Sequence, residues 1–360
     1  MSDLKPSVED MLRIGKGCGL TLLTEAFNNY MNHYDLFFRI SEFQEQMQTF
    51  AIELKELGFS PNDELDPTMT IDEALKLFPR KPLVVYHKSC SDGFGAMWCF
   101  WQKFGYSYEY TPGSYAEGHF DLDNFHDRDV VLVDFSYKRN IVAQIIEVAK
   151  SVKIIDHHKS ALEDLEGLEG LDFCNSTIEH SGAMLAWMYL NPGVEAPWAI
   201  QLIEDRDLWK FKHAATKDFS QYLFSLDYDI NVWDQAIQEA EEPNTFFSMC
   251  KGGAAIERKH LKDINELKKY TRWMTIGGFI VPVMNVSYMM ASDAGNQLCK
   301  ENPDVPFAAT YYDSDKGRHF SLRSIELGAD VSKIAFMYGG GGHLHASGFN
   351  VTRDHELAKV

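Results

Sequence analysis

The feature that most constrains the fold is a short apolar run that ends abruptly in one acid and two histidines. Residues 152–155 are rich in strand-forming side chains, and Asp156, His157 and His158 follow directly. A strand buried on both faces of a parallel sheet has such an apolar sequence. Ligands of open α/β sheets collect at the carboxyl ends of the strands. The stretch therefore predicts a strand opening into a site, the alternative being a polar strand end with one capped histidine.

Two more apolar runs end in the same way. Residues 83–86 are followed by His87 and then by Asp92 and Gly93, and residues 130–133 are followed by Asp134. Segments of helical length separate the three runs, as a doubly wound parallel sheet requires. Carboxylate oxygens and imidazole nitrogens together are donors typical of Mn, Zn or Fe sites. We therefore expect an α/β fold with a metal centre at one edge of the sheet.

The net charge limits the partners that the protein can bind. The chain of 360 residues has 53 acids and 34 bases, a balance of −19. Tight binding of long nucleic acid depends on neutralising phosphates, so long duplexes are not expected. A small anionic substrate held by local charges and bound cations is compatible with this acidity.

The cysteines and the hydropathy indicate a cytoplasmic protein with no membrane partner. The six cysteines show no Cys-x-x-Cys spacing and resemble reduced thiols rather than a disulfide framework. No apolar run approaches the roughly 18 residues of a membrane span, and the N-terminus lacks a signal-peptide pattern. The cysteines are Cys18, Cys90, Cys99, Cys174, Cys250 and Cys299.

A glycine run near the C-terminus is the second candidate site. Gly340, Gly341 and Gly342 precede His343 and expose backbone N–H groups that could cradle a phosphate or carboxylate. A flexible linker is the alternative for a glycine run. Apolar segments bracket this run, which favours a structured loop.

Four elements in this order resemble a known family. His87 with Asp92-Gly93, then Asp134, then residues 156–158, then residues 340–343 resemble the DHH phosphoesterase superfamily with its DHH-associated C-terminal domain. The resemblance covers about residues 81–353 and is strongest for the oligoribonuclease or cyclic-nucleotide phosphodiesterase-like branch. It implies a parallel-sheet DHH catalytic domain at 81–215, a helical connector at 216–275 and a smaller α/β substrate-binding domain at 276–360. Residues 1–80 are expected to form a helical N-terminal extension.

The resemblance also implies roles for individual residues. Two Mn²⁺ ions are expected, one held by Asp92, Asp134, His157 and a fourth acid, and the other by His87 and Asp134. The fourth acid is Asp205 or Asp207, and we favour Asp205 because it closely follows the apolar helical run at 199–203. Cys90 stands where many members have an acid, so either the thiolate is a soft ligand or water fills that position.

The remaining implied roles concern the substrate. His158 is expected either behind the metal ligands or in contact with the phosphate, and His158 and Asp156 are the expected catalytic residues. The residues expected to grip a terminal phosphate or sugar, remote from the scissile bond, are Arg323, Ser324, Gly340, Gly341, Gly342 and His343.

The expected function is hydrolysis of short oligonucleotides or small nucleotides, including cyclic ones, by water activated between two metal ions. A polyphosphate or pyrophosphate hydrolase and a non-catalytic nucleotide-binding protein are the alternatives. The sequence does not decide whether the protein is a monomer or a homodimer.

Overall fold

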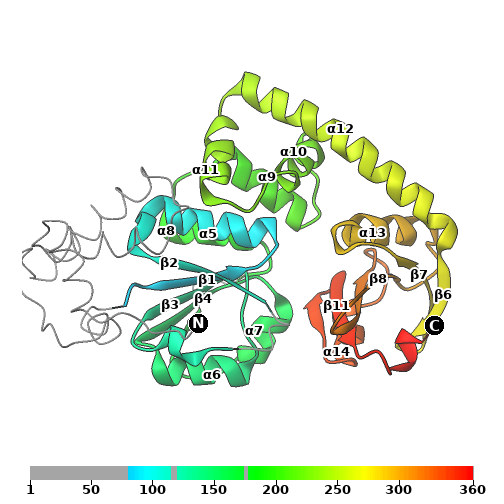
Figure 1. Cartoon of the computed structure of the whole chain (residues 1–360), viewed down its shortest axis with the longest axis horizontal. Helices are drawn as coiled ribbons and strands as arrows, with labels where there is room; N and C mark the ends of the chain where they lie inside the picture. The colour runs from blue at the N-terminus through cyan, green and yellow to red at the C-terminus, as the bar shows by residue number, and fades with distance from the viewer. Residues whose placement is uncertain (1–79, 115–119, 174–176, 360) are drawn as a thin grey trace, which may run out of the picture. The chain divides into compact units, whose positions relative to one another are not determined.

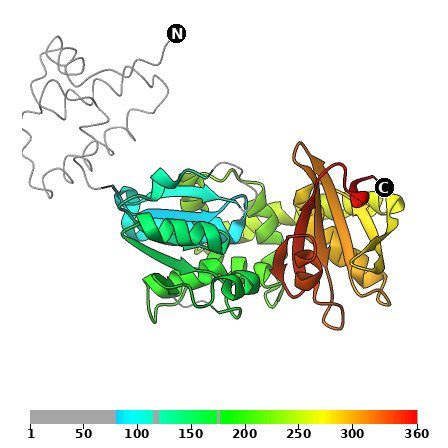
Figure 2. The same ribbon diagram turned by 90° about the horizontal axis from the view of Figure 1, so that it is seen from below.

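The computed structural model describes residues 80–114, 120–173 and 177–359, and the two sheets within them can be followed in Figures 1 and 2. The expected helical extension at 1–80 lies outside these residues except for residue 80. The chain divides into two compact units, and the larger one comprises residues 84–103, 110–126 and 130–360. All of the candidate site described below lies in this larger unit.

The first sheet is the parallel α/β sheet that the apolar runs predict. Its strand order is β2-β1-β3-β4-β5, and β4 pairs in parallel with the short β5. Helices α5 and α8 lie on one face and α6 on the other (Figure 1), so the central strands are buried on both faces. The strands are β1 (Leu83–His87), β2 (Glu109–Gly113), β3 (Asp129–Val133), β4 (Ser151–Ile155) and β5 (Leu171–Phe173).

The helices that flank or follow this sheet begin where the sequence offers caps or apolar periodicity. Helix α8 begins after Ser181, whose hydroxyl accepts a hydrogen bond from the Met184 N–H, and Pro243 occupies the first turn of α12. These helices are α5 (Ser91–Phe104), α6 (Arg139–Val148), α7 (Lys159–Leu165), α8 (Gly182–Leu190), α9 (Trp198–Asp207), α10 (Thr216–Phe224), α11 (Ile230–Glu239) and α12 (Pro243–Leu267).

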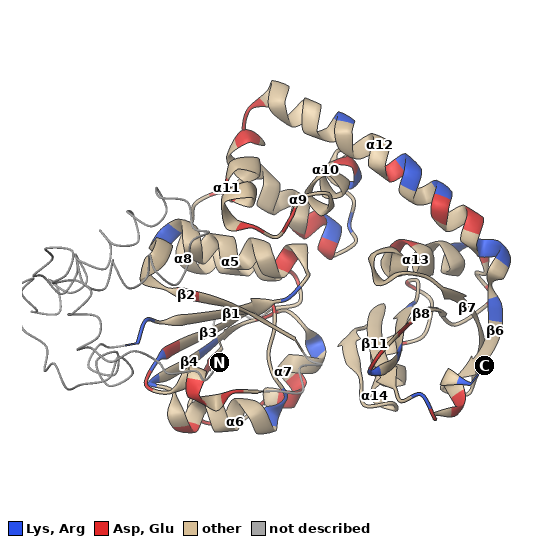
Figure 3. Ribbon diagram, in the orientation of Figure 1, with Lys and Arg blue, Asp and Glu red and all other residues tan. Residues whose placement is uncertain are grey.

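Helix α12 is a long charged helix, as the sequence predicts for residues 216–275. Figure 3 shows Lys and Arg interspersed with Asp and Glu along its C-terminal half. Lys259 and Asp263, one turn apart, form an ion pair there, which is typical of a solvated helix face.

The second sheet is mixed. Its order is β10-β11-β9-β8-β7-β6, and only the β7–β8 pair is parallel. Gly277 and Gly278 both have positive φ and form the two-residue turn between β6 and β7. The strands are β6 (Arg272–Ile276), β7 (Phe279–Asn285), β8 (Ala308–Ser314), β9 (Gly317–Arg323), β10 (Gly341–His343) and β11 (Ala346–Val351), and the helices are α13 (Ala291–Glu301) and α14 (Val331–Phe336).

Two further observations concern the described residues. None of their helices combines the length and the apolar character that crossing a membrane requires. The four cysteines among them, Cys90, Cys99, Cys250 and Cys299, are all free thiols.

Candidate metal centre

The ends of three neighbouring strands place the predicted side chains at one edge of the first sheet. His87 is the last residue of β1, Asp134 follows β3 and Asp156 follows β4, and these strands are adjacent in the sheet. Asp134 has a φ of 54°, a left-handed conformation that is uncommon for a residue other than glycine and is often found at functional sites. Its N–H donates to the Ile155 carbonyl at 2.9 Å, which fixes this turn.

Three carboxylates converge on one imidazole nitrogen. His157 Nε2 lies 3.1 Å from Asp134 Oδ1, 3.5 Å from Asp207 Oδ2 and 3.6 Å from Asp92 Oδ2. Asp92, Asp134 and His157 are almost completely buried. Ligand atoms that share an octahedral ion at about 2.1 Å lie about 3 Å apart when adjacent, so this grouping fits a divalent cation.

The other oxygen of Asp134 faces a second set of donors. Asp134 Oδ2 lies 3.5 Å from His87 Nδ1, and one ligand atom from each of His87, Cys90 and Asp134 lies within 4.8 Å of the others. Among the described residues, Asp134 Oδ2 accepts no hydrogen bond. A buried carboxylate oxygen without a donor is costly, so Asp134 fits a bridging position between two ions.

The electrostatics of the cluster also favour a bound cation. Burial and the neighbouring carboxylates raise the pKa of Asp92 well above its ordinary value. Burial opposes ionisation of Asp134 as well, but the neighbouring His157 and His87 imidazoles hold its pKa well below the ordinary value. Burial would lower the pKa of His157, and the surrounding carboxylates raise it instead. Without a cation, one imidazolium must balance three crowded carboxylates.

The N-terminus of α8 positions two of these carboxylates. Asp92 accepts hydrogen bonds from the N–H groups of Gly182 and Ala183 at 2.6 and 3.0 Å. A Cβ on Gly182 would lie 2.4 Å from Asp134 Cβ, so only glycine allows this close approach. No local pattern in the sequence marks Gly182, because its two partners lie 90 and 48 positions earlier in the chain.

Asp156 holds the two-histidine turn in place. Its Oδ1 accepts from His158 Nδ1 at 2.7 Å and from the His157 and His158 N–H groups at 2.8 and 3.2 Å. Although burial would lower the pKa of His158, Asp156 raises it. Asp156 is fully buried, and these hydrogen bonds position the two histidines; its expected catalytic role stays a prediction.

The geometry does not support the preference for Asp205 as the fourth acid, because Asp205 does not face His157. Asp205 accepts hydrogen bonds from the N–H groups of Lys212 and His213 at 2.9 and 3.1 Å and from the Thr216 hydroxyl, and so closes the loop after α9. Asp207 is the acid that reaches His157. Residues two apart on a helix point to nearly opposite sides, and the sequence did not reveal which side faces the sheet.

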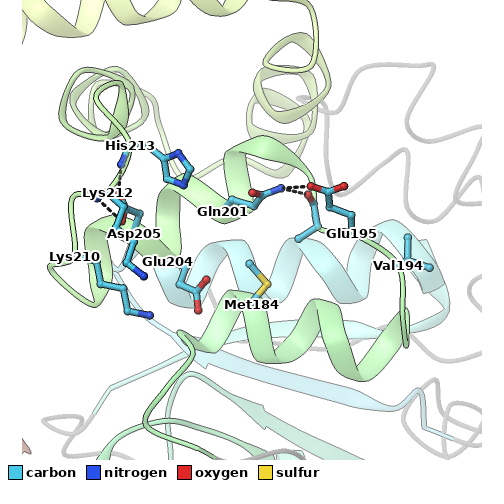
Figure 4. A pocket seen from close by; sticks show the side chains of 10 residues that line it. Met184, Val194, Glu195, Gln201, Glu204, Asp205, Lys210, Lys212 and His213 are labelled. Atoms are coloured by element: carbon cyan, nitrogen blue, oxygen red, sulfur yellow. Dashed lines mark hydrogen bonds between the residues drawn. The ribbon is translucent and has the colours of Figure 1, made fainter.

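Asp205 instead borders a separate pocket of about 380 Å³ (Figure 4). Polar groups there bond to one another, for example Glu204 to His180 Nδ1 at 2.6 Å and Gln201 to the Ala196 carbonyl at 2.8 Å. Asp207 and His157 do not line it, so this pocket is distinct from the metal centre. Its lining residues are Met184, Val194, Glu195, Ala196, Gln201, Glu204, Asp205, Lys210, Lys212 and His213.

His343 lies at the metal centre, in contrast to the expectation of a remote loop. Its ring centroid is 4.8 Å from that of His157 and 4.5 Å from that of His158, and the three histidines offer ligand atoms within 4.8 Å of one another. Burial and the positive charge of its two neighbours lower the pKa of His343 to about 3, so its ring is neutral. The Gly342 N–H donates to Ser160 Oγ at 3.2 Å beside it.

The glycine run forms a strand, so its N–H groups are less open than the sequence suggested. The Gly340 N–H donates to the Ala335 carbonyl at 2.9 Å, and Gly341–His343 pair with β11. A Cβ on Gly340 would lie 2.1 Å from the Gly348 carbonyl oxygen. Close packing of β10 on β11 is therefore the physical reason for glycine at that position.

Arg323 and Ser324 are held by neighbours in the same part of the chain. Arg323 Nη2 donates to Ser292 Oγ at 2.7 Å, and Ser324 Oγ lies 2.9 Å from His345 Nδ1. Burial and the nearby Arg206 guanidinium lower the pKa of Arg323 to about 10, while Asp207 acts in the opposite direction. The Arg323 guanidinium thus stays charged at neutral pH and lies within electrostatic reach of an acid of the metal centre.

Comparisons with known proteins give distant relatives of the chain. No family model matches the chain. The chain is 30% identical over 284 residues to an uncharacterized protein of Acanthamoeba polyphaga mimivirus, covering 74% of this chain and 66% of that protein. It is 27% identical over 224 residues to the oligoribonuclease NrnB of Bacillus subtilis, covering 58% of this chain and 55% of that protein. The chain therefore spans less than two thirds of the length of either relative.

The solved structures show a similar fold. The DHH domain of a member of the s1p family of ribosomal proteins superposes with a TM-score of 0.50 at 12% identity, covering 78% of this chain and 85% of that one. At this identity the likeness concerns the fold alone.

Proposed function

We propose that the chain, which resembles the DHH phosphoesterase superfamily in its motifs and is similar to the oligoribonuclease NrnB, is a metal-dependent phosphodiesterase for short oligonucleotides or small nucleotides, cyclic ones included. One observation carries the proposal. The carboxylates of Asp92, Asp134 and Asp207 converge on His157 Nε2, and the second oxygen of Asp134 faces His87. This is the donor arrangement of a two-ion site with one bridging carboxylate.

The residues fit a pair of divalent ions, for which Mn²⁺ is the expected metal. Asp92, Asp134, His157 and Asp207 would hold one ion, and His87 and Asp134 the other. When bound, two such ions polarise a phosphoryl oxygen and lower the pKa of a bound water enough to supply a nucleophile near neutral pH.

The histidines beside the site bind and orient the anionic phosphate. Asp156 accepts the Nδ1–H of His158 and favours its protonated form, so the other ring nitrogen donates to an anionic phosphoryl oxygen. The neutral ring of His343, stacked on His158, fills the other side without adding positive charge. Together the two rings orient the phosphodiester and limit access of bulk water.

Arg323 supports binding of a second charged group of the substrate. Its guanidinium is held by Ser292. Arg206 nearby is already paired with Asp293 at 2.9 Å, so Arg323 is the cation of the two that is offered to an anionic group of the substrate. We include Ser324 and the strand Gly341–His343 in this substrate-binding part. The division into a catalytic domain at 81–215, a connector at 216–275 and a substrate-binding domain at 276–360 is part of the same proposal.

The acidic chain favours a short substrate, because a net charge of −19 opposes long polyanions outside the metal centre. The similarity to an oligoribonuclease over more than half of the chain points in the same direction. Hydrolysis of polyphosphate and binding without turnover are the alternatives.

The test is turnover of a dinucleotide, a cyclic dinucleotide and polyphosphate by the full chain in Mn²⁺, with Asp134→Asn as control. We expect cleavage of at least one nucleotide substrate by wild type and none by the variant. Cleavage of polyphosphate alone, or binding of nucleotides without turnover by the metal-loaded protein, would overturn the proposal.

A further inference from the structure

The two oxygens of Asp134 face donor sets of different chemistry. Oδ1 lies in a group of three carboxylates and one imidazole, those of Asp92, Asp134, Asp207 and His157. Oδ2 lies 3.5 Å from His87 Nδ1, and the Cys90 thiol offers a ligand atom within 4.8 Å of ligand atoms of both residues. The first group offers mainly hard oxygen atoms, and the second offers nitrogen, sulfur and one oxygen.

The Cys90 thiol is held in place by the turn between β1 and α5. Ser89 before it has a φ of 55°, and the Cys90 carbonyl accepts the Phe94 N–H at 3.0 Å as α5 begins. A Cβ on Gly93 would lie 2.5 Å from the His87 carbonyl oxygen, so the start of α5 packs tightly against the end of β1. The backbone segments that carry the Cys90 thiol and the His87 ring are therefore held in a fixed arrangement.

Ligand softness decides which ion each group prefers. Thiolates select zinc-like ions, whereas carboxylates suit manganese and magnesium. A coordinated thiol is deprotonated by the ion itself, and one His, one Cys and one carboxylate leave a four-coordinate zinc with an open position. Two ions of the same kind would leave one of the two groups poorly matched.

We propose that the centre is asymmetric, with a thiophilic divalent ion of the zinc class at His87, Cys90 and Asp134 and a manganese-class ion at Asp92, Asp134, His157 and Asp207. This inference rests on the two-ion site of the proposed function and assigns a different metal to each position.

The first test is spectroscopic and needs no substrate. The metal-free full chain is titrated with Co²⁺, which gives a near-ultraviolet charge-transfer band when a thiolate coordinates it. Wild type should show the band, and so should the matched control Cys250→Ser, which changes a thiol in α12. Cys90→Ser should lose the band and bind Co²⁺ at least about tenfold more weakly. Absence of the band in wild type, or its persistence in Cys90→Ser, would overturn the inference.

The second test measures which metals are taken up in competition. Zn²⁺ binds N/O/S sites more tightly than Mn²⁺ in general, so the dialysis uses Mn²⁺ in large excess over about one equivalent of Zn²⁺ per chain. Wild type should then retain one ion of each kind. Cys90→Asp should shift toward two Mn²⁺, because a hard ligand replaces the soft one. Two Mn²⁺ in wild type would overturn the asymmetry.

The outcomes separate the two proposals. Turnover of a nucleotide without the cobalt band rejects the asymmetric centre and leaves the proposed phosphodiesterase in place. The cobalt band without turnover of any phosphodiester supports the asymmetric centre and rejects the proposed phosphodiesterase. Thermal melting of each cysteine variant shows whether a lost signal reflects unfolding.

Discussion

Replacing Gly182 by alanine tests whether α8 positions the bridging carboxylate. The new Cβ would lie 2.4 Å from Asp134 Cβ and 2.7 Å from Oδ1, whereas ordinary contact begins at 3.4 Å. The difference between 2.4 and 3.4 Å means that Asp134 or the start of α8 must shift by 1.0 Å. Either shift also disturbs Asp92, which is bonded to the Gly182 and Ala183 N–H groups.

The expected loss follows from this distance. A misplacement of about 1 Å in a catalytic group costs about 10²-fold in rate, which corresponds to about 2.7 kcal/mol in activation free energy. Overpacking should also lower the free energy of unfolding by about 1–3 kcal/mol. Alanine is a better helix former than glycine, so poorer helix propensity does not explain a loss.

The assay compares kcat/KM for a dinucleotide, Mn²⁺ affinity and thermal unfolding in wild type, Gly182→Ala and Gly252→Ala. Gly252 lies within α12, and its added Cβ would meet only Tyr222 Cδ2, at 3.9 Å. Gly252→Ala should therefore keep full activity and metal affinity. Full activity and unchanged Mn²⁺ affinity in a folded Gly182→Ala protein would refute the reasoning.

Three further predictions test the roles of residues that the sequence alone could not distinguish. Asp207→Asn should weaken Mn²⁺ binding at least about tenfold. It should leave the metal-free protein as stable as wild type or more so, because burial and the nearby Asp134 carboxylate raise the pKa of Asp207. Calorimetric titration and melting measure both effects. Asp205→Asn should leave Mn²⁺ affinity unchanged and lower the free energy of unfolding by about 1–3 kcal/mol. Burial opposes ionisation of Asp205, but the Thr216 hydroxyl and two N–H groups lower its pKa. Denaturant titrations should therefore show the full difference in the free energy of unfolding between wild type and Asp205→Asn at pH values above the unfolded carboxyl pKa of about 3.9. This difference should shrink as the pH falls through the lower pKa of folded Asp205. A difference that does not change with pH would contradict the prediction. Arg323→Ala should reduce kcat/KM strongly for a dinucleotide and far less for a small aryl phosphodiester. His343→Ala should reduce kcat/KM for both substrates, because the His343 ring lies against His157 and His158. Equal losses on the two substrates from Arg323→Ala would contradict a substrate-binding role for Arg323 away from the reacting phosphate.

The sequence predicted the strand ends because that signal is local. An apolar run followed directly by His87, Asp134 or Asp156 shows both the buried strand and the polar edge of the sheet. The choice between Asp205 and Asp207 failed, because it depends on the rotation of α9 against the sheet. Periodicity left this rotation undetermined in a helix with both acids at its end.

Long-range contacts explain the other differences. Gly182 and Asp92 meet through packing of α8 beside α5, and no local pattern records such a contact. His343 joins the other histidines through contact of β10 with the region of Ser160. The glycine run suggested open N–H groups. In the structure β10 pairs with β11, and glycine is needed because the two strands pack closely.

Hydrolysis of a dinucleotide in ¹⁸O-labelled water by the metal-loaded full chain tests the central claim most directly. We expect mononucleotide products with one solvent oxygen in the newly formed phosphate group, and no product from Asp134→Asn, in which an amide replaces the proposed bridging carboxylate. Absence of product from wild type with both metal positions filled, or a product phosphate without the label, would contradict it.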